Sequence, residues 1–137
     1  MISSAAEFIK LRISDNSEEY RRTVSEEISE AVCIELIEKH PEMKIWVIGN
    51  KTVPLSILNI LSNDNDSNIR FSIALKRKLS HELFEKLSMD NDESVRQCIA
   101  SNKKTPIDIL EKLALDVEDM VKEVAIERLD ELANSKK

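Results

Sequence analysis

The sequence predicts an all-α fold, a right-handed α-solenoid of about five short helical hairpins. Three observations lead to this fold class. The pattern of Asp92–Asp116 (DESVRQCIASNKKTPIDILEKLALD) recurs every 26 residues along the chain. Within each copy, apolar residues follow the i, i+3, i+4 spacing of one helix face. Turn and capping residues recur between the apolar stretches, and a fixed period of this size is typical of stacked repeats.

The copies align in columns that are apolar in successive repeats. Asp92–Asp116 aligns with Asp66–Asp90 and, one period earlier, with Glu42–Asp64, whereas Glu118–Leu129 repeats only its first half. The aligned apolar positions are Met43, Ile69, Val95 and Val121; Val47, Ile73, Ile99 and Ala125; Ile57, Leu83 and Ile109; and Leu61, Leu87 and Leu113. We expect the last of these columns to be buried between neighbouring hairpins.

The 137 residues are expected to form one domain. We assign residues 1–41 to a divergent N-terminal repeat and cap, 42–118 to three regular repeats, and 119–137 to a C-terminal capping helix and tail. A capping helix is expected over Ala5–Ile13, after which Tyr20, Arg21 and Val24 take the places of Val95, Arg96 and Ile99. Atypical ends are what a solenoid needs, because they cover its terminal interior.

Helix boundaries follow from residues that recur in the turns. Thr105 is expected to be the N-cap of a second helix, with Pro106 at its first position and Asp108 completing a capping box. The sole glycine, Gly49, is expected to end a first helix in a left-handed C-cap. Aspartates of the DND stretches at 64–66 and 90–92 are expected to start first helices.

A strand-containing leucine-rich repeat is the main alternative, because Leu110–Leu115 fits its L-x-x-L-x-L pattern. In the other copies Met89 and Asn63 replace the last leucine. The segments also lack the β-branched alternation of a strand. We therefore favour the helical repeat.

The stretch Val95–Asp116 resembles the repeat of the leucine-rich-repeat-variant proteins, within the broader HEAT-like α-solenoid class. The matching residues are Val95, Arg96, Ala100, Asn102, Thr105, Pro106, Leu110, Leu113, Ala114 and Asp116. The likeness extends from Glu42 to about Leu129 and more weakly over Ser14–His40, with Leu79–Ser80 departing from its Thr-Pro pair. It implies an architecture and a binding scaffold, because such folds serve varied partners.

Composition restricts the classes of function. Charged residues make up 34% of the chain and the formal net charge is -6, which argues against a general nucleic-acid binder and suits a basic protein partner. Cys33 and Cys98 lie in no CxxC motif, so we expect reduced thiols. The N-terminal stretch lacks a basic n-region and the longest apolar run is residues 45–48, so we expect no signal peptide, no membrane span and a cytoplasmic protein.

No motif for catalysis, metal binding or cofactor binding stands out. One glycine excludes phosphate-cradling glycine loops, and His40 and His81 lack the spacing of zinc ligands. Residues 64–68 begin like a calcium loop, but Ile69 and Leu75 occupy the places of its glycine and glutamate. We therefore expect a protein that is not an enzyme and that holds no cofactor and no metal.

Two sets of basic residues recur with the repeat. Lys44, Arg70, Arg96 and Lys122 each follow the first apolar residue of a first helix, and we expect them to pair with aspartates of the repeat turns. A second set lies in the turns after first helices and is predicted to form a basic edge that could bind a polyanion. Its residues are Lys51, Lys76, Arg77, Lys78, Lys103 and Lys104. The alternative is that bases simply end helices where the dipole favours them.

A candidate partner-binding patch consists of Ile45, Trp46 and Phe71. The column of Ile45 and Phe71 becomes polar in later repeats, at Gln97 and Glu123, which indicates an exposed face. We therefore expect the three residues to be exposed and to anchor a partner or a second copy. In the alternative interpretation the N-terminal helices cover them.

These features favour a non-catalytic protein–protein interaction module, a monomer or weak homodimer whose partner is a protein. One specialised form is an immunity or inhibitor protein that neutralises a basic toxin. A nucleic-acid-binding HEAT-like protein that uses the basic edge is one alternative, although the net charge of -6 opposes it. An accessory subunit of an enzyme complex is another, and it rests on fold analogy.

Overall fold

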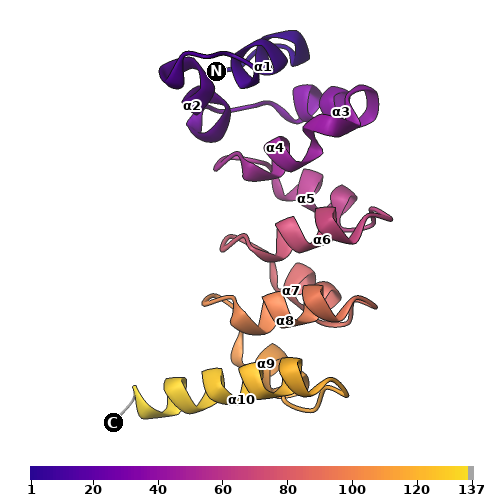
Figure 1. Ribbon diagram of the computed structural model, residues 1–137, viewed down its shortest axis with the longest axis vertical. Coiled ribbons are helices and arrows are strands. Elements are labelled where there is room, and N and C mark those ends of the chain that lie inside the picture. Colours follow the sequence, from indigo (N-terminus) through magenta and orange to yellow (C-terminus); the bar gives the residue numbers. More distant parts are fainter. Residues whose placement is uncertain (136–137) are drawn as a thin grey trace. The chain divides into compact units, whose positions relative to one another are not determined.

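A computed structural model describes residues 1–135, and over these residues the all-α prediction is confirmed. They form ten α-helices and one short 3-10 helix and contain no β-strand, only an isolated bridge between Ile2 and Ile28. Most of the helices are short, and the last one is the longest (Figure 1). The chain divides into a first unit, Met1–Asn63, and a second unit, Asp64–Lys137. The predicted tail ends in Lys136 and Lys137, which lie outside the described residues.

The first unit contains the predicted N-terminal capping helix and the helices that follow it. Its elements are α1 (Ala5–Arg12), α2 (Ser17–Ser25), α3 (Glu30–Lys39), the 3-10 helix η1 (Pro41–Met43), α4 (Lys44–Gly49) and α5 (Leu55–Leu61). Helix α1 packs on α2 and α3, α2 packs on α4, and α3 packs on α5. Phe8, Leu36 and Ile57 are fully buried and bring α1, α3 and α5 into the core of this unit.

The second unit is arranged around α8. Its helices are α6 (Ser67–Ala74), α7 (His81–Ser88), α8 (Glu93–Ser101), α9 (Ile107–Leu113) and α10 (Asp119–Asn134). Helix α8 contacts α6, α7, α9 and α10. Its buried side chains are Val95, Cys98, Ile99 and Ala100. Ile73, Leu87 and Ile99 are completely buried, and Leu113 is only 2% exposed, as predicted.

The helix starts in the second unit confirm two predictions and correct one. Asp66 and Asp92 cap α6 and α8 by accepting from the backbone amides two residues later, at 2.9 and 2.8 Å. Thr105, by contrast, is not the N-cap of α9, which begins after Pro106. The Thr105 hydroxyl is buried and donates to the carbonyl oxygen of Ile99 at 2.6 Å. It therefore provides a hydrogen-bond donor for a carbonyl group in the last turn of the preceding helix, α8.

The expected left-handed C-cap at Gly49 is also wrong. Gly49 is the last residue of α4, and no residue of the described chain has a positive φ. The chain leaves the helix through Asn50 in an extended conformation. The Asn50 side chain accepts from the backbone amide of Thr52 at 2.8 Å, which holds this turn without any need for glycine.

The predicted register of the N-terminal repeat is wrong as well. Val95 and Ile99 are fully buried, whereas Tyr20, placed in the Val95 column, is 39% exposed. The buried residue of α2 is Thr23. Its hydroxyl donates to the carbonyl oxygen of Tyr20 and accepts from Arg12, so a small polar side chain can occupy the interior at this position.

Candidate functional site

Arginines of the first basic set have a structural role in the second unit. Nε of Arg70 lies 2.7 Å from Asp90, and Nε of Arg96 lies 2.8 Å from Asp116. Each guanidinium also donates through Nη1 to a backbone carbonyl oxygen six residues earlier, at 2.8 Å in both cases. The four side chains are nearly buried, so the expected pairing is confirmed for these two arginines and their charge is already neutralised.

In the second basic set, by contrast, four residues of the second unit form no ion pair with a described carboxylate. Lys76–Lys78 follow α6, and Lys103 and Lys104 follow α8, while Lys51 lies in the first unit. Among the described residues, no carboxylate lies within ion-pair distance of Arg77, Lys78, Lys103 or Lys104. This group therefore presents uncompensated positive charge at the ends of α6 and α8.

The side chain of Asn102 joins the two basic turns. Its Nδ2 donates to the carbonyl oxygens of Ala74 and Lys76 at 2.9 and 2.7 Å, and its Oδ1 accepts from the backbone amide of Lys104 at 3.0 Å. Asn50 makes similar bonds in the first unit, to the carbonyl oxygens of Thr23 and Glu26. Asn102 thus fixes the backbone from which the cations project.

A cavity of about 220 Å³ lies between these turns and is called the basic cavity below. It is lined by the cations Arg77 and Lys103, by Ser101 and Asn102, and by the apolar side chains of Ala74, Leu75 and Cys98. Burial raises the pKa of the Cys98 thiol to about 11, so the thiol is protonated at neutral pH. The lining of the cavity therefore combines two cations with uncharged, partly apolar side chains.

Lys76 is a partly buried cation in the turn after α6. Burial lowers its pKa, and the nearby charge of Lys78 lowers it further. Lys76 lies 26 positions after Asn50 and 26 before Asn102, so a lysine stands where two other repeats have the turn-joining asparagine. Sequence reasoning grouped Lys76 with the other cations and overlooked this substitution.

The first unit holds a second candidate surface, which we call the arginine cluster: Arg12, Tyr20 and Trp46. The Arg12 guanidinium lies between the two rings, 3.7 Å from the centroid of Tyr20 and 3.6 Å from that of Trp46. It also donates to the hydroxyls of Thr23 and Tyr20. Arg12 is only 8% exposed, whereas Trp46 is 41% and the adjacent Ile45 is 45% exposed.

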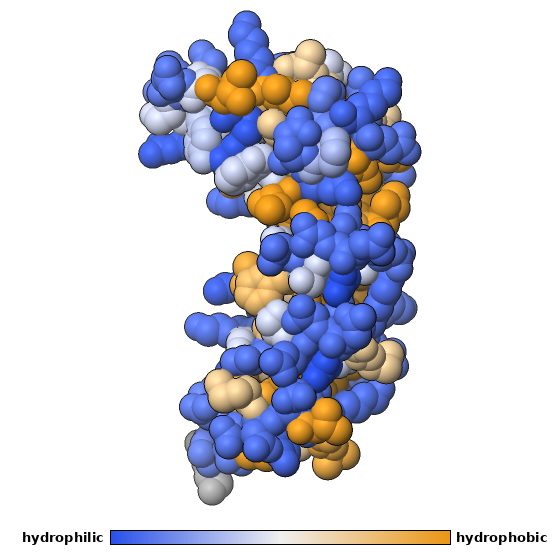
Figure 2. Space-filling view, turned by 45° about the vertical axis from the view of Figure 1, so that its right-hand side comes forward, coloured by the Kyte–Doolittle hydropathy of each residue, from blue (hydrophilic) through white to orange (hydrophobic). Residues whose placement is uncertain are grey.

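The exposure of the predicted patch residues is therefore as expected, but their surroundings differ from expectation. One face of Trp46 is covered by Arg12 from the N-terminal capping helix, so for this residue the alternative interpretation, in which N-terminal helices cover the patch, is correct in part. Phe71 is 36% exposed and belongs to α6 in the second unit, so a joint patch of Ile45, Trp46 and Phe71 remains a prediction. Hydrophobic areas, in orange, interrupt the mostly hydrophilic surface in Figure 2.

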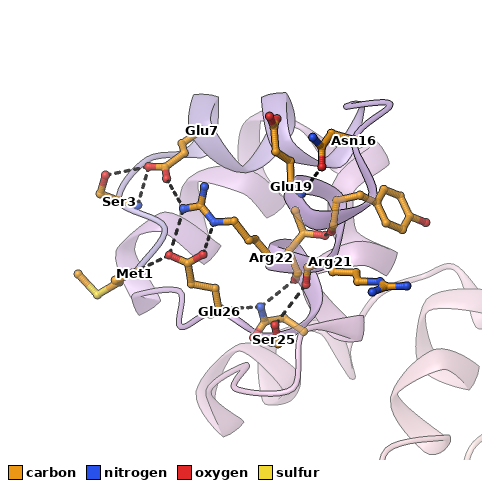
Figure 3. Close-up of polar contacts among 12 residues, drawn as sticks. Met1, Ser3, Glu7, Asn16, Glu19, Arg21, Arg22, Ser25 and Glu26 are labelled. Carbon is orange, nitrogen blue, oxygen red and sulfur yellow. Dashed lines mark hydrogen bonds and ion pairs between the residues drawn. The ribbon is translucent and has the colours of Figure 1, made fainter.

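A polar network in the first unit joins the first residues of the chain to α1 and α2. Arg22 reaches between the carboxylates of Glu7 and Glu26 (Figure 3), with Nε 2.5 Å from Glu26. The amino group of Met1 lies 2.7 Å from the same carboxylate. Hydrogen bonds from Arg22 and then from the Met1 amino group lower the pKa of Glu26 to about 2. These contacts tie the N-terminal residues to α1 and α2.

His81 lies 2.7 Å from Asp108 in an exposed pair. Within residues 1–135, no three His, Cys, Asp or Glu side chains are placed to share a metal ion. None of the helices in this range has both the length and the apolar character needed to cross a membrane. Comparison with known proteins finds no matching family model, curated protein or solved structure.

Proposed function

We propose that this protein is a non-catalytic protein-interaction module, built as a right-handed α-solenoid of hairpins that repeat every 26 residues. The repeated architecture is supported by equivalent contacts: Arg70 and Arg96, 26 positions apart, bind an aspartate 20 residues later in the same way. Packing of α6 on α8 and of α8 on α10 is also what stacked first helices would give. Such scaffolds present side chains on rigid, repeated helices.

The observation that carries the interaction function is the arginine cluster with its exposed neighbour Ile45. Tryptophan, tyrosine and arginine are the residue types that dominate protein–protein binding energy. Here the Arg12 guanidinium stacks on both rings and so restricts their motion before any partner binds. A surface that is already ordered loses less entropy on association. Exposed Trp46 and Ile45 are therefore well suited to anchor a partner.

A specialised form of this function is neutralisation of a basic partner, such as a toxin. Asp90 and Asp116 are occupied by arginines of the chain itself, so they are poor candidates for such a contact. A second cavity, of about 240 Å³, lies at the starts of α8 and α10 and is lined by Glu93, Glu118 and Asp119 together with apolar neighbours. This cavity is the place where a basic side chain would meet carboxylates.

The experiment compares two variants of one exposed residue type. Ile45 and Ile107 are both 45% exposed and both lie in the first turn of a helix. Immobilised wild-type protein, Ile45→Glu and Ile107→Glu are incubated with lysate, and bound proteins are identified by mass spectrometry. We expect a partner that Ile45→Glu loses and Ile107→Glu retains.

Binding of the purified partner to Trp46→Ala then gives the energy of the anchor by titration calorimetry. Truncation should weaken binding by about 2 kcal/mol or more, because central aromatic anchors dominate such interfaces. Circular dichroism of each variant confirms that the fold is kept. A set of captured proteins that is identical for all variants would contradict the role of this surface.

A further inference from the structure

We propose that the basic cavity of the second unit binds an acidic polypeptide segment. A carboxylate of the segment would lie between Arg77 and Lys103, and an apolar side chain would cover Leu75 and Cys98. The inference rests on the proposed interaction function and adds the chemistry of one partner. It concerns the second unit, whereas the arginine cluster belongs to the first.

The charges around the cavity are the first reason. The protein has 26 acidic residues and a net charge of -6, yet no carboxylate of the described chain pairs with Arg77, Lys78, Lys103 or Lys104. In the same unit, Arg70 and Arg96 are both neutralised by aspartates. In the second unit, these four cations lie in the two turns that border the cavity, where they repel one another until an anion arrives.

The rigidity of the two turns is the second reason. Asn102 bonds to backbone groups of both turns and is itself 9% exposed, so the positions from which the cations project are set before binding. Lys76, which occupies the equivalent asparagine position, adds a partly buried charge beside this frame. Ionisable groups with perturbed pKa values concentrate at functional sites.

The size and lining of the cavity decide between classes of ligand. A volume of about 220 Å³ is below the roughly 300–1,000 Å³ of pockets that enclose small molecules, so it suits one side chain or a chain end. Among the described residues, its lining includes Leu75 and Cys98 but no aromatic residue on which a base could stack. These features favour an acidic polypeptide with apolar residues over a nucleic acid.

The test uses two fluorescein-labelled probes of equal net charge. One is a peptide of alternating glutamate and leucine, and the other is a single-stranded oligothymidylate. Anisotropy titrations at low salt should give a measurable Kd for the peptide and a Kd at least about tenfold weaker for the oligonucleotide. Amide resonances of Ala74–Arg77 and Ser101–Lys104 should shift on peptide addition. Tighter binding of the oligothymidylate would overturn the proposal in favour of a nucleic-acid site.

Three charge reversals locate the site. Arg77→Glu and Lys103→Glu should each weaken peptide binding by about tenfold or more, because each removes a charge-assisted contact and adds a repulsive one. Lys51→Glu makes the same change in net charge on the predicted basic edge but in the first unit, and it should change the Kd by less than about threefold. An equal effect of Lys51→Glu would show diffuse attraction and overturn the cavity proposal.

Lys76→Asn provides a variant that does not depend on charge reversal. It introduces the asparagine found at the equivalent positions, so we expect helicity and the unfolding midpoint to be kept while peptide affinity falls. Absence of peptide binding to the folded wild-type protein at about 1 mM would refute the inference. That result would leave the Ile45 capture experiment unaffected, because it probes the other unit.

Discussion

Asn102→Ala should lower the free energy of unfolding, because it removes the side chain that joins the two basic turns. The side chain is 9% exposed and makes three hydrogen bonds with backbone groups, to Ala74, Lys76 and Lys104. Each such bond contributes about 1 kcal/mol net, and backbone groups left unpaired in a buried place add to the loss. The expected decrease in the free energy of unfolding is about 2–4 kcal/mol. That is a large part of the roughly 5–15 kcal/mol typical of a domain.

Urea denaturation followed by far-UV circular dichroism measures this loss. The midpoint should fall while the m-value stays constant, since the surface exposed on unfolding does not change. Asn102→Asp is the matched variant, because it keeps the shape and the acceptor for Lys104 but turns a carboxylate oxygen toward two carbonyl oxygens. Its penalty should shrink as the pH falls and the carboxylate gains a proton. A loss below about 1 kcal/mol for Asn102→Ala would refute the bracing role of this side chain.

Three further substitutions test the packing, the backbone and the ion pairs. Leu113→Ala should lower the free energy of unfolding by about 2–5 kcal/mol in urea melts. The control Leu115→Ala, at a position 84% exposed, should lower it by less than about 0.5 kcal/mol. Equal losses for the two variants would contradict the assignment of Leu113 to the core. Gly49→Ala should raise the free energy of unfolding by about 0.4–1 kcal/mol, because the φ of Gly49 is not positive and nothing lies within 4 Å of an added Cβ. A loss of stability would show that this position does not tolerate a side chain. Burial alone would raise the pKa of Asp116, but hydrogen bonds from Arg96 and a backbone amide outweigh it and lower the pKa. Asp116→Asn should therefore cost about 1–3 kcal/mol at neutral pH. The difference from wild type should begin to decrease below about pH 4 and disappear once the pH is below the lowered folded-state pKa of Asp116; a pH-independent difference would argue against the ion pair.

Much of the helical fold could be predicted because the same local rules recur in each repeat. Helical spacing placed Ile73, Ile99 and Leu113 in the core, where they are. Aspartates that cap helices and arginines that bind the turns also follow from local sequence, and both are confirmed in the second unit. The division into two units could not be inferred, because neighbouring repeats have similar sequences on both sides of Asn63.

The candidate sites were predicted less completely, because they depend on contacts between distant residues. Arg12 belongs to no repeat column, so periodicity gave no reason to place it against Trp46. Thr105 has the residue type of an N-cap, but its hydroxyl bonds to the helix before it. The cations of the basic edge could be identified individually, whereas the cavity between Arg77 and Lys103 depends on how α6 and α8 pack.

The stacking of Arg12 on Trp46 has an optical consequence. Trp46 is the only tryptophan of the chain, so all indole emission comes from a ring whose one face is covered by a cation of α1. Its emission wavelength, lifetime and accessibility to quenchers such as iodide will therefore report whether Arg12 of α1 still covers the ring. Release of α1 alone would change this signal before the helix content of the second unit falls. The protein thus carries an intrinsic fluorophore for detachment of its N-terminal helix.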